Sequence, residues 1–284
     1  MTVVAIDGVF VDESRAVLPL SDRGVLHGDS VFEVLRVYAG RPFLLEEHLL
    51  RFERSAVALR FGAVDVPLWA TEVGAAVARF GGASDAVLRV MLTRGDGRLR
   101  APLGATSGRR VVVVEALPPV DPSLYERGVA AVVLDHPRVR PDDASASGKY
   151  ARYLPNLLAL DDARQRGADE ALWLDPAGNL AEAATANVFV VDGDDLWTAP
   201  LSSGVLAGIT RAEVLRLAAA SGLRGREEAF PVSALARATE VFLTSSVREL
   251  VPVRSVDGGN VGTGAPGPWT RRLHAALRER ALRK

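Results

Sequence analysis

Two kinds of hydrophobic spacing alternate along this chain, and together they predict a fold of mixed helices and strands. Apolar residues recur every three or four positions in the segments that we expect to be helical, namely 44–61, 67–80, 155–166, 208–220 and 269–282. They alternate with polar residues, or form short β-rich runs, in the segments that we expect to be strands, namely 2–12 (two strands about a turn), 31–38, 86–93, 110–117, 129–134, 170–174, 187–191, 195–198, 240–244 and 250–254. Polar, glycine-containing stretches between them predict loops, including 20–30, 94–109 and 137–148.

A proline-rich stretch divides the predicted elements into two groups. The segment Pro118-Pro119-Val120-Asp121-Pro122 follows the strand expected at 110–117 and fits neither spacing. A chain of 284 residues is long enough for two ordinary domains. We therefore expect an N-terminal α/β domain over 1–117, a linker over 118–127, and a C-terminal domain over 128–284.

Composition and charge argue against several classes of partner. The chain is 48% hydrophobic and 24% charged, as in globular proteins with a substantial core. Its net charge of −1 gives no reason to expect nucleic acid or an anionic membrane as a partner. No apolar run approaches the roughly 18 residues of a membrane helix, and the first residues lack a signal-peptide pattern. The absence of cysteine excludes disulfides and thiolate chemistry and fits a cytoplasmic protein.

Lysine is unusually rare in this sequence. Of the thirty-four basic residues, Lys149 and Lys284 alone are lysines, and arginine serves everywhere else. Arginine stays protonated, whereas a desolvated lysine can lose its proton and form a Schiff base with a carbonyl. Composition alone leaves a catalytic Lys149 and an ordinary surface lysine equally well supported.

Motifs of other enzyme classes are absent or out of context. Segment 262–267 matches GxGxxG, but it contains a proline and follows a turn rather than a buried strand, so we interpret it as a plain loop. GxSxG and HExxH do not occur. The four histidines lack ligand spacing, so no metal site is predicted, and His48 is expected to be a hydrogen-bonded core residue.

Four further features are candidates for chemistry, and the first three also have an ordinary explanation when each is considered alone. Gly208-Ile209-Thr210 opens a predicted helix, whose first N–H groups could hold an anion or could simply be capped. Ser245 and Ser246 place hydroxyls at a strand end, as turns often do. Arg51 would by itself be a solvated helix residue. Glu182 is a lone acid among small and apolar residues, where a carboxylate needs a cationic partner.

Considered together with Lys149, these features match the needs of pyridoxal phosphate. A lysine amine holds the aldehyde of that cofactor, an anion cradle holds its phosphate, and an acid keeps its pyridine nitrogen protonated. The combination favours the catalytic interpretation of Lys149 and predicts pyridoxal 5′-phosphate as the cofactor.

The ordered motifs resemble those of the fold-type IV pyridoxal-phosphate aminotransferases. That family includes branched-chain aminotransferases, D-amino-acid transaminases, (R)-amine transaminases and 4-amino-4-deoxychorismate lyases. The resemblance covers nearly the whole chain and rests on 22–24, 28–33, 47–51, Lys149, 167–171, Glu182, 186–189, 208–211 and 249–253. It implies a smaller N-terminal α/β domain and a larger C-terminal domain with the cofactor at their interface. It also implies a homodimer in which the partner chain contributes to the active site.

The resemblance assigns roles to individual residues. The residues that it assigns to the cofactor are Arg51, Lys149, Glu182, Leu206, Ile209, Thr210, Ser245 and Ser246. Lys149 would form the Schiff base and act as the general base, and Glu182 would pair with the pyridine nitrogen. Leu206 would pack on the ring, and the phosphate would be held by Arg51, Ile209, Thr210 and Ser246. Ser245 is a further cofactor-binding candidate.

Substrate choice is less strongly specified. Segment 31–38 resembles that of D-amino-acid transaminases, and the spacing from Lys149 to Asn156 resembles both those enzymes and the 4-amino-4-deoxychorismate lyases. We expect a D-amino acid as donor and a 2-keto acid as acceptor. The Arg-x-His loop that traps the carboxylate in those enzymes has no histidine here, and Phe32 replaces its tyrosine. The substrate-binding candidates are therefore Phe32, Arg98 and Arg100, with Arg36 and Arg152 as lesser ones. These arginines fit an ordinary solvated loop equally well.

Other functions remain open at this stage. A lyase of the same family would release pyruvate from aminodeoxychorismate without a keto-acid acceptor. A branched-chain enzyme would prefer L-leucine or L-isoleucine, and an (R)-amine transaminase would accept amines that lack a carboxylate. A non-catalytic binding protein on the same fold is the remote alternative, against which Lys149, Glu182 and Arg51 argue.

Overall fold

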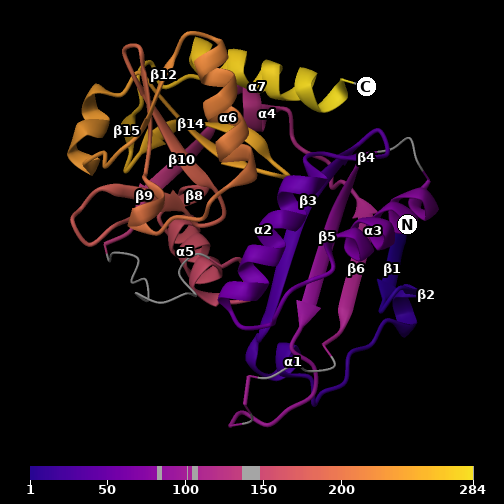
Figure 1. The fold of residues 1–284 in the computed structure, drawn as a ribbon. Coiled ribbons are helices and arrows are strands. Elements are labelled where there is room, and N and C mark those ends of the chain that lie inside the picture. Colours follow the sequence, from indigo (N-terminus) through magenta and orange to yellow (C-terminus); the bar gives the residue numbers. More distant parts are fainter. Residues whose placement is uncertain (82–84, 101, 104–107, 136–147, 284) are drawn as a thin grey trace. The chain divides into compact units, whose positions relative to one another are not determined.

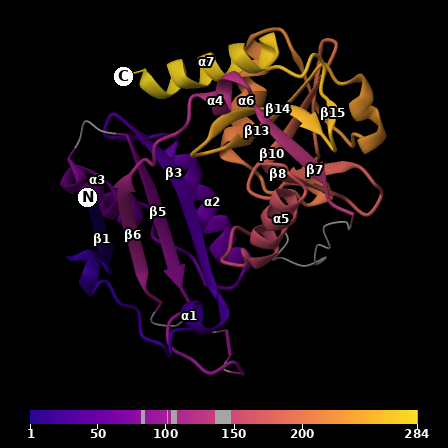
Figure 2. The ribbon, with the colours of Figure 1, turned by 180° about the vertical axis from the view of Figure 1, so that it is seen from behind.

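The computed structural model describes residues 1–81, 85–100, 102–103, 108–135 and 148–283 (Figures 1 and 2). Contacts divide the chain into two compact units. Unit 1 is Met1–Pro118 with Asp142–Arg152, and unit 2 is Pro119–Pro141 with Tyr153–Lys284. The loop predicted at 137–148 lies outside the described residues, apart from Gly148.

Unit 1 is an antiparallel sheet with two helices packed on one face (Figure 1). The strand order is β2 (Val9–Val11), β1 (Thr2–Ile6), β6 (Arg110–Ala116), β5 (Ala86–Thr93), β3 (Ser30–Tyr38) and β4 (Arg41–Pro42). The helices are α2 (Leu45–Ala58) and α3 (Val66–Phe80). Their apolar faces share one core with the sheet, and the Phe52 and Trp69 rings meet edge to face at 5.0 Å. Because α2 packs on β3, side chains that point from one toward the other are buried.

Local sequence explains why both helices form where they do. In α2 the inward positions His48, Leu49, Phe52 and Ala56 recur at helical spacing, and all are buried. Asp65 caps α3 by accepting a hydrogen bond from the Leu68 N–H at 2.9 Å. The first turn of α3 also carries a proline, which a helix tolerates at that position.

Residues 148–152 belong to unit 1, whereas the sequence-based boundary put Lys149 in the second domain. The reason is a long-range pairing with β3. Tyr150 forms a bridge with Val31, and the Ala151 N–H donates to the Ser30 carbonyl at 3.0 Å. Gly28 lies close beneath this segment, since a Cβ at Gly28 would meet the Ala151 carbonyl oxygen.

Unit 2 is built around a ring of strands. In order, β10 (Asn187–Asp192), β13 (Glu240–Ser245), β14 (Glu249–Val256), β7 (Val129–Val133), β8 (Glu170–Leu174) and β9 (Leu180–Ala183) pair with one another, and β9 pairs back to β10. The sheet continues from β10 into β11 (Asp195–Thr198) and β12 (Arg224–Glu227), and β15 (Gly259–Asn260) pairs with β14. Buried residues from every strand of the ring form one apolar cluster, so its interior is a packed core.

Helices cover the outside of this ring. Helix α5 (Leu154–Gln165) packs on β8, where Ala159 and Ala163 join a second apolar cluster with Trp173. Helix α6 (Ile209–Ala220) packs on β12 and β13, and α7 (Pro268–Leu282) packs on α6 and β14. The short α4 (Ser123–Glu126) lies within the predicted linker and contacts β14. The 3-10 helices η1 (Glu13–Arg15), η3 (Leu201–Ser203) and η4 (Val232–Arg237) lie in connections.

The predicted mixture of helices and strands is confirmed, and most ends of the predicted elements lie within two residues of the observed ends. The predicted loop 20–30 contains α1 (Arg23–His27), because Asp22 accepts from the Gly24 N–H at 2.7 Å and Gly28 ends the turn with a φ of 66°. Strand β9, which carries Glu182, was missed because its sequence LAEA shows no clear alternation. Segment 262–267 is a turn-rich loop, as predicted. Within the described residues, no helix has the length and apolar character to cross a membrane.

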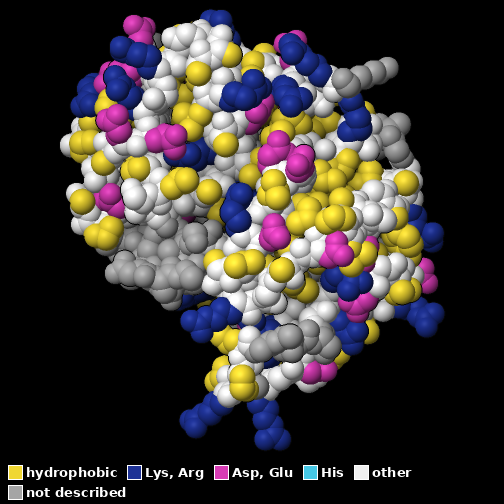
Figure 3. Space-filling model, in the orientation of Figure 1, with side chains coloured by type: hydrophobic (Ala, Val, Ile, Leu, Met, Phe, Trp, Pro, Cys, Tyr) yellow, Lys and Arg dark blue, Asp and Glu magenta, His cyan; other side chains and the backbone are white. Residues whose placement is uncertain are grey.

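Basic and acidic side chains are interspersed on the face of the molecule that Figure 3 shows. On the face drawn in Figure 3, lysines and arginines in dark blue alternate with aspartates and glutamates in magenta. This mixture agrees with the net charge of −1 and indicates that neither positive nor negative electrostatic potential dominates that face.

Candidate active site

The backbone of Lys149 is fixed within unit 1 on both sides. Its carbonyl accepts a hydrogen bond from the Phe32 N–H of β3 at 3.2 Å. Its own N–H donates to Ser55 Oγ of α2 at 3.1 Å. The Ser55 hydroxyl donates in turn to the Arg51 carbonyl, one turn earlier in the helix, at 2.9 Å. Hydrogen bonds to β3 and to α2 therefore hold Lys149 between these two elements of unit 1.

The side chain of Lys149 lies against an aromatic ring. Its Nζ is 4.7 Å from the centroid of the Phe32 ring, which is 5% exposed. The Arg89 guanidinium is 5.3 Å from the same centroid. A ring at this distance attracts a cation and offers the amine an apolar neighbour. The structure thus brings together two of the predicted site residues, Lys149 and Phe32.

A buried ionic cluster lies between β3 and α2. Glu33, which is fully buried, accepts hydrogen bonds from Arg51 Nε and Nη2, both at 2.7 Å, and contacts His48 Nδ1 at 2.8 Å. Burial by itself raises the pKa of Glu33. The charge and hydrogen bonds of Arg51, together with the hydrogen bond of His48, outweigh burial and lower the pKa from 4.5 to about 2. Glu33 is therefore an anion at neutral pH and fixes the Arg51 guanidinium in a two-point grip.

His48 is neutral in this cluster. Burial lowers its pKa below the ordinary 6.5, the Glu33 contact opposes that effect, and the charges of Arg51 and Lys149 lower it further. Because Glu33 is ionised, the proton of the neutral ring sits on Nδ1 and is donated to that carboxylate. The prediction of a hydrogen-bonded core histidine is confirmed. Arg51 is 4% exposed, which excludes a solvated helix arginine.

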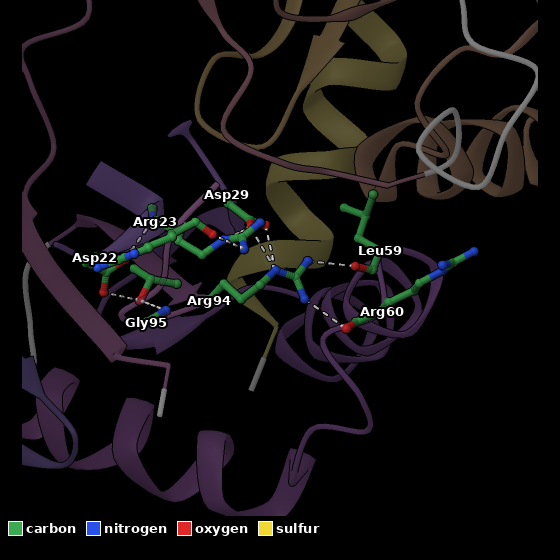
Figure 4. A network of polar contacts seen from close by, with 10 residues as sticks. Asp22, Arg23, Asp29, Leu59, Arg60, Arg94 and Gly95 are labelled. Atoms are coloured by element: carbon green, nitrogen blue, oxygen red, sulfur yellow. Dashed lines mark hydrogen bonds and ion pairs between the residues drawn. The ribbon is translucent and has the colours of Figure 1, made fainter. Parts of the chain in front are cut away.

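A second charged network, shown in Figure 4, holds the loop that follows β5. Asp29 accepts from Arg23 Nε at 2.9 Å and from Arg94 Nε at 2.8 Å. Arg94 also donates to the carbonyls of Leu59 at 2.8 Å and Arg60 at 2.9 Å. Those carbonyls follow the end of α2, where helix carbonyls lack partners within the helix. The network ties the start of β3, the end of α2 and the loop into one rigid piece.

The predicted carboxylate-binding arginines lie on that loop. The Arg98 carbonyl accepts from Arg23 Nη1 at 3.2 Å, so the backbone at Arg98 is anchored. Asp96 accepts from Ser21 Oγ at 2.7 Å, which adds a second anchor. The side chains of Arg98 and Arg100 are exposed. The structure therefore combines an anchored backbone with two exposed cations.

The two lesser candidates differ from each other. Arg36 is 7% exposed, donates to Asp85 at 2.7 Å and lies 4.5 Å from the Tyr38 ring centroid. It stands four residues beyond Phe32 on β3, about 13 Å along the strand. These contacts give Arg36 a structural ion pair and do not support a substrate role. Arg152 is exposed, and its backbone N–H donates to the Tyr150 carbonyl at 2.8 Å.

In unit 2, Glu182 and Leu206 are in direct contact. Glu182 is 4% exposed, and its Oε2 accepts from the Leu206 N–H at 2.9 Å. The Leu206 carbonyl accepts from Asn187 Nδ2, also at 2.9 Å. Asn156 at the start of α5 donates to the carbonyl of Ala184, in the turn that connects β9 to β10. The predicted pair of acid and ring-packing leucine is thus assembled within this unit.

The start of α6 has the form of an anion site. Gly208 is the N-cap and, having no side chain, makes no cap hydrogen bond to the first turn, in which Ile209 and Thr210 are buried. Ser245 ends β13 and its Oγ accepts from the Arg248 N–H at 3.3 Å. Ser246 follows in the turn to β14 and is partly buried. The neighbouring Thr244 Oγ1 is buried and has no hydrogen-bond partner among the described residues.

An ion pair inside unit 2 holds the turn between β13 and β14. Arg248 Nη1 donates to Glu170 Oε2 at 3.0 Å, and the Glu170 side chain is fully buried. Burial raises the pKa of Glu170, and the charge and hydrogen bond of Arg248 oppose that effect. The Arg248 carbonyl accepts from the Tyr125 hydroxyl at 3.2 Å. The turn that carries Ser246 is therefore tied to β8 by charge.

Comparison with known proteins assigns the family. Residues 30–256 match the family model described as amino-transferase class IV, which covers most of the chain. The chain belongs to the class IV aminotransferases. The fold-type IV architecture implied by the motifs is therefore confirmed.

Relatives of this class IV aminotransferase carry two kinds of name. A putative branched-chain-amino-acid aminotransferase of Methanocaldococcus jannaschii is 34% identical over 279 residues, which cover 97% of this chain and 95% of that protein. A D-alanine aminotransferase of Bacillus licheniformis is 31% identical over 283 residues, covering 98% and 97%. The crystal structure of the Escherichia coli branched-chain amino acid aminotransferase superposes with a TM-score of 0.91 at 30% identity, covering 98% of this chain and 93% of that one. These names agree on amino-group transfer and differ on the donor.

Class IV aminotransferases use pyridoxal phosphate, which confirms the predicted cofactor. The residues of this class IV chain fit that group. Within unit 1 the Lys149 amine is a group that can bind the aldehyde, and within unit 2 the Glu182 carboxylate is a group that can bind the ring nitrogen. The N-terminus of α6 lacks a side-chain cap, and the buried Thr244 hydroxyl lacks a partner within the described part of the chain. Both are groups that a bound oxyanion can satisfy.

Sequence reasoning missed several residues that hold the site in this aminotransferase. Glu33 fixes Arg51, Ser55 anchors Lys149, Asn187 holds Leu206, and Glu170 holds the turn with Ser246. Glu33 carried a usable signal, since it is a lone acid in an apolar strand, as Glu182 is. The contacts of Ser55 and Asn187 depend on strand register and loop course, which residue type alone does not indicate.

Proposed function

We propose that this class IV aminotransferase transfers the amino group of a D-amino acid to a 2-keto acid, with Lys149 as its catalytic residue. The observation that carries the proposal is the setting of Lys149. Its backbone is anchored to Ser55 and Phe32, and its amine lies 4.7 Å from the centre of the Phe32 ring. An amine with a fixed backbone and an apolar neighbour is suited to covalent binding of a carbonyl and to repeated proton transfer.

In this proposal each residue of the site has a separate role in amino-group transfer. Pyridoxal phosphate, when bound, supplies the electron sink that makes the substrate Cα–H acidic. Lys149 holds the cofactor, and its released amine moves the proton from the substrate Cα. Glu182 keeps a proton on the ring nitrogen, and Leu206, whose N–H it binds, packs on the ring. The uncapped start of α6 receives the phosphate.

The remaining cofactor residues complete that phosphate site in this proposal. Arg51 supplies a cation whose direction is set by Glu33. Ile209 and Thr210 supply first-turn N–H groups, and Ser246 supplies a hydroxyl, with Ser245 beside it holding the Arg248 N–H. A dianionic phosphate gains most from such preorganised donors, because they need no rearrangement on binding.

The loop after β5 supports a carboxylate-bearing substrate. Its backbone is anchored through Arg23 to Asp29, while the side chains of Arg98 and Arg100 are exposed. An anchored loop that presents guanidinium groups suits recognition of an α-carboxylate. The likeness of segment 31–38 to D-amino-acid transaminases and the 31% identity to the Bacillus licheniformis enzyme support the D-configuration.

A half-reaction screen tests this proposal. The cofactor-loaded protein is mixed with D-alanine and other D- and L-amino acids, and loss of its visible absorption band is followed together with keto-acid formation. D-alanine should react, Lys149→Ala should abolish turnover while inorganic phosphate still binds, and Arg98→Ala or Arg100→Ala should raise the KM for D-alanine. Turnover by Lys149→Ala would refute the catalytic role, and an unchanged KM in both arginine variants would refute the carboxylate role.

A branched-chain L-amino acid is the second candidate donor. The 34% identity to the Methanocaldococcus jannaschii protein and the TM-score of 0.91 to the Escherichia coli enzyme favour it. The same screen separates the two, because faster reaction with L-leucine or L-isoleucine than with any D-amino acid would replace the first proposal by the second. Pyruvate release from aminodeoxychorismate without an acceptor would instead indicate the lyase.

We also infer a homodimer. Leu154, Leu157 and Leu158 recur at helical spacing on α5 and are 66%, 57% and 56% exposed, which is unusual for a cluster of leucines. We infer that a second copy of the chain packs against this cluster and buries it. Light scattering that gives the mass of one chain would refute the dimer. The cytoplasmic location expected from the sequence stays a prediction.

A further inference from the structure

Three polar residues stand side by side on the outside of the ring of strands in unit 2. Asn187 of β10 is the register partner of Glu182 on β9 and of Thr244 on β13. Residues directly opposite each other on neighbouring strands point to the same face of a sheet. Their sequence neighbours Val188 and Leu243 belong to the interior core, so the row of Glu182, Asn187 and Thr244 faces outward. Helix α6 packs on this outer side, against β13.

Two members of the row grip one residue between them. The Leu206 N–H is bound by the Glu182 carboxylate and the Leu206 carbonyl by the Asn187 amide, each at 2.9 Å. Both backbone groups of Leu206 are thus fixed by adjacent side chains of the same sheet. These two groups belong to successive peptide units, so the chain is held on both sides of the Leu206 Cα. In turn, the Leu206 N–H fixes the direction of the Glu182 carboxylate.

The same asparagine also fits tightly under Gly208. A Cβ at Gly208 would overlap Asn187 Oδ1, so any larger residue must displace the Asn187 amide from its present position. The φ of Gly208 is −67°, an ordinary value, so space rather than backbone conformation requires glycine here. Gly208 is the N-cap of α6, and the position of Asn187 therefore bears on where that helix begins.

The proposed site needs two groups of unit 2 to keep a fixed separation. One is the Glu182 carboxylate, which serves the ring nitrogen, and the other is the N-terminus of α6, which serves the phosphate. The segment 206–208 connects them, and Asn187 touches it at Leu206 and at Gly208. We propose that Asn187 is a positioning residue that sets the distance between the acid and the anion site. This inference rests on the proposed function, because it presupposes the cofactor roles of Glu182 and α6.

Removing the amide should have two measurable effects. Asn187→Ala should weaken binding of pyridoxal phosphate to the apoprotein by about three- to tenfold, the effect of about one hydrogen bond. It should also raise the protonation midpoint of the visible absorption band of the loaded protein. A loosely held Glu182 protonates the ring less firmly, and a less protonated ring draws fewer electrons from the lysine linkage. A residue with a merely structural role would lower the melting temperature and move neither quantity.

Gly208→Ala offers an independent route to the same displacement. The added methyl group must push the Asn187 side chain away from Leu206, so this variant should reproduce both effects of Asn187→Ala. The double variant Asn187→Ala with Gly208→Ala should bind the cofactor no worse than either single variant, since the first change removes the atom that the second would strike. Additive losses would show that the two positions act separately and would overturn the proposal.

Matched controls isolate the claim. Asn179→Ala removes another asparagine of unit 2 that donates a side-chain hydrogen bond, to Asp175 at 3.0 Å in a turn, and should change neither affinity nor midpoint. If Asn187→Ala fails to fold by circular dichroism, Asn187→Ser and Gly208→Ala carry the same test. Wild-type affinity and midpoint in those variants would overturn the positioning role alone. A wild-type protein that does not bind pyridoxal phosphate would overturn the proposed function and this inference with it.

Discussion

Replacing Glu33 by glutamine tests the ionic cluster that fixes Arg51. The carboxylate is fully buried between β3 and α2 and receives two hydrogen bonds from Arg51 and one from His48. Glutamine keeps the size of the side chain and removes its charge. The Arg51 guanidinium, itself 4% exposed, then stays buried without its counter-ion. Removing one partner of a buried ion pair costs about 3–5 kcal/mol of folding free energy.

The pKa of Glu33 gives a second measure of the same interaction and fixes its pH dependence. That pKa is about 2 in the folded protein against an ordinary 4.5. At about 1.4 kcal/mol per pH unit, the difference corresponds to about 3 kcal/mol. Because the folded pKa is depressed, this stability is fully present above pH 4.5 and is lost as the pH falls toward 2. Protonation of His48, whose pKa is also lowered by burial, weakens the fold in the same direction below its ordinary 6.5.

Urea unfolding of the apoprotein between pH 7 and about pH 3.5 measures both quantities. Glu33→Gln should be less stable than wild type by about 3 kcal/mol at pH 7, and the gap should narrow by about 1.4 kcal/mol per unit below pH 4.5. Glu47→Gln, which removes an exposed carboxylate from the same helix, should follow wild type within about 0.5 kcal/mol. A gap between Glu33→Gln and wild type that stays constant down to pH 3.5 would refute the depressed pKa, and no gap at pH 7 would refute the cluster itself.

Two further substitutions test how the site is held. Ser55→Ala removes the acceptor of the Lys149 N–H, so the folding free energy should fall by about 1 kcal/mol. The turnover number should fall by about tenfold or more, because Lys149 is then misplaced. Lowered stability with an unchanged turnover number would contradict a positioning role. Glu170 has the opposite pH behaviour from Glu33, since burial raises its pKa. The stabilisation that comes from protonated Glu170 is present at low pH and is lost as the pH rises from the ordinary 4.5 through the raised pKa. In urea titrations the wild type should therefore lose folding free energy as the pH rises through this range. Glu170→Gln should not show that loss. Parallel pH profiles of the two proteins would count against the raised pKa.

Local sequence patterns were sufficient to predict most elements. Helix α3 was predicted close to its observed bounds because its apolar positions recur at helical spacing, and β5 because its residues form a β-rich run between loops. These signals lie within the element itself. Strand β9 has only four residues, and its identity comes from pairing with β8 and β10 rather than from its own pattern. Sequence reasoning could place Glu182 in an apolar setting but could not place it on a strand.

The site was predicted in part for the same reason. Lys149 was found by its rarity, and Arg51 by a motif, yet the contacts that hold them were not foreseen. Residues 148–152 pair with β3, more than one hundred positions earlier in the chain, so a boundary drawn at the proline-rich linker misassigned them. The Ser55 hydroxyl meets Lys149 only because that pairing exists. Long-range register determines such contacts, and no window of sequence contains it.

The two buried glutamates show how far residue type can carry an inference. Glu33 and Glu182 are each a single acid in an apolar strand, and the physical expectation for both is a strongly bound partner. In the fold, Glu33 grips the guanidinium of Arg51, whereas Glu182 binds the backbone N–H of Leu206. Glu33 is therefore paired with a cation inside unit 1, and Glu182 accepts a hydrogen bond from the backbone inside unit 2. Residue type alone treats the two acids alike, and sequence reasoning selected Glu182 while missing Glu33, because the partner of each acid is set by long-range pairing in the fold.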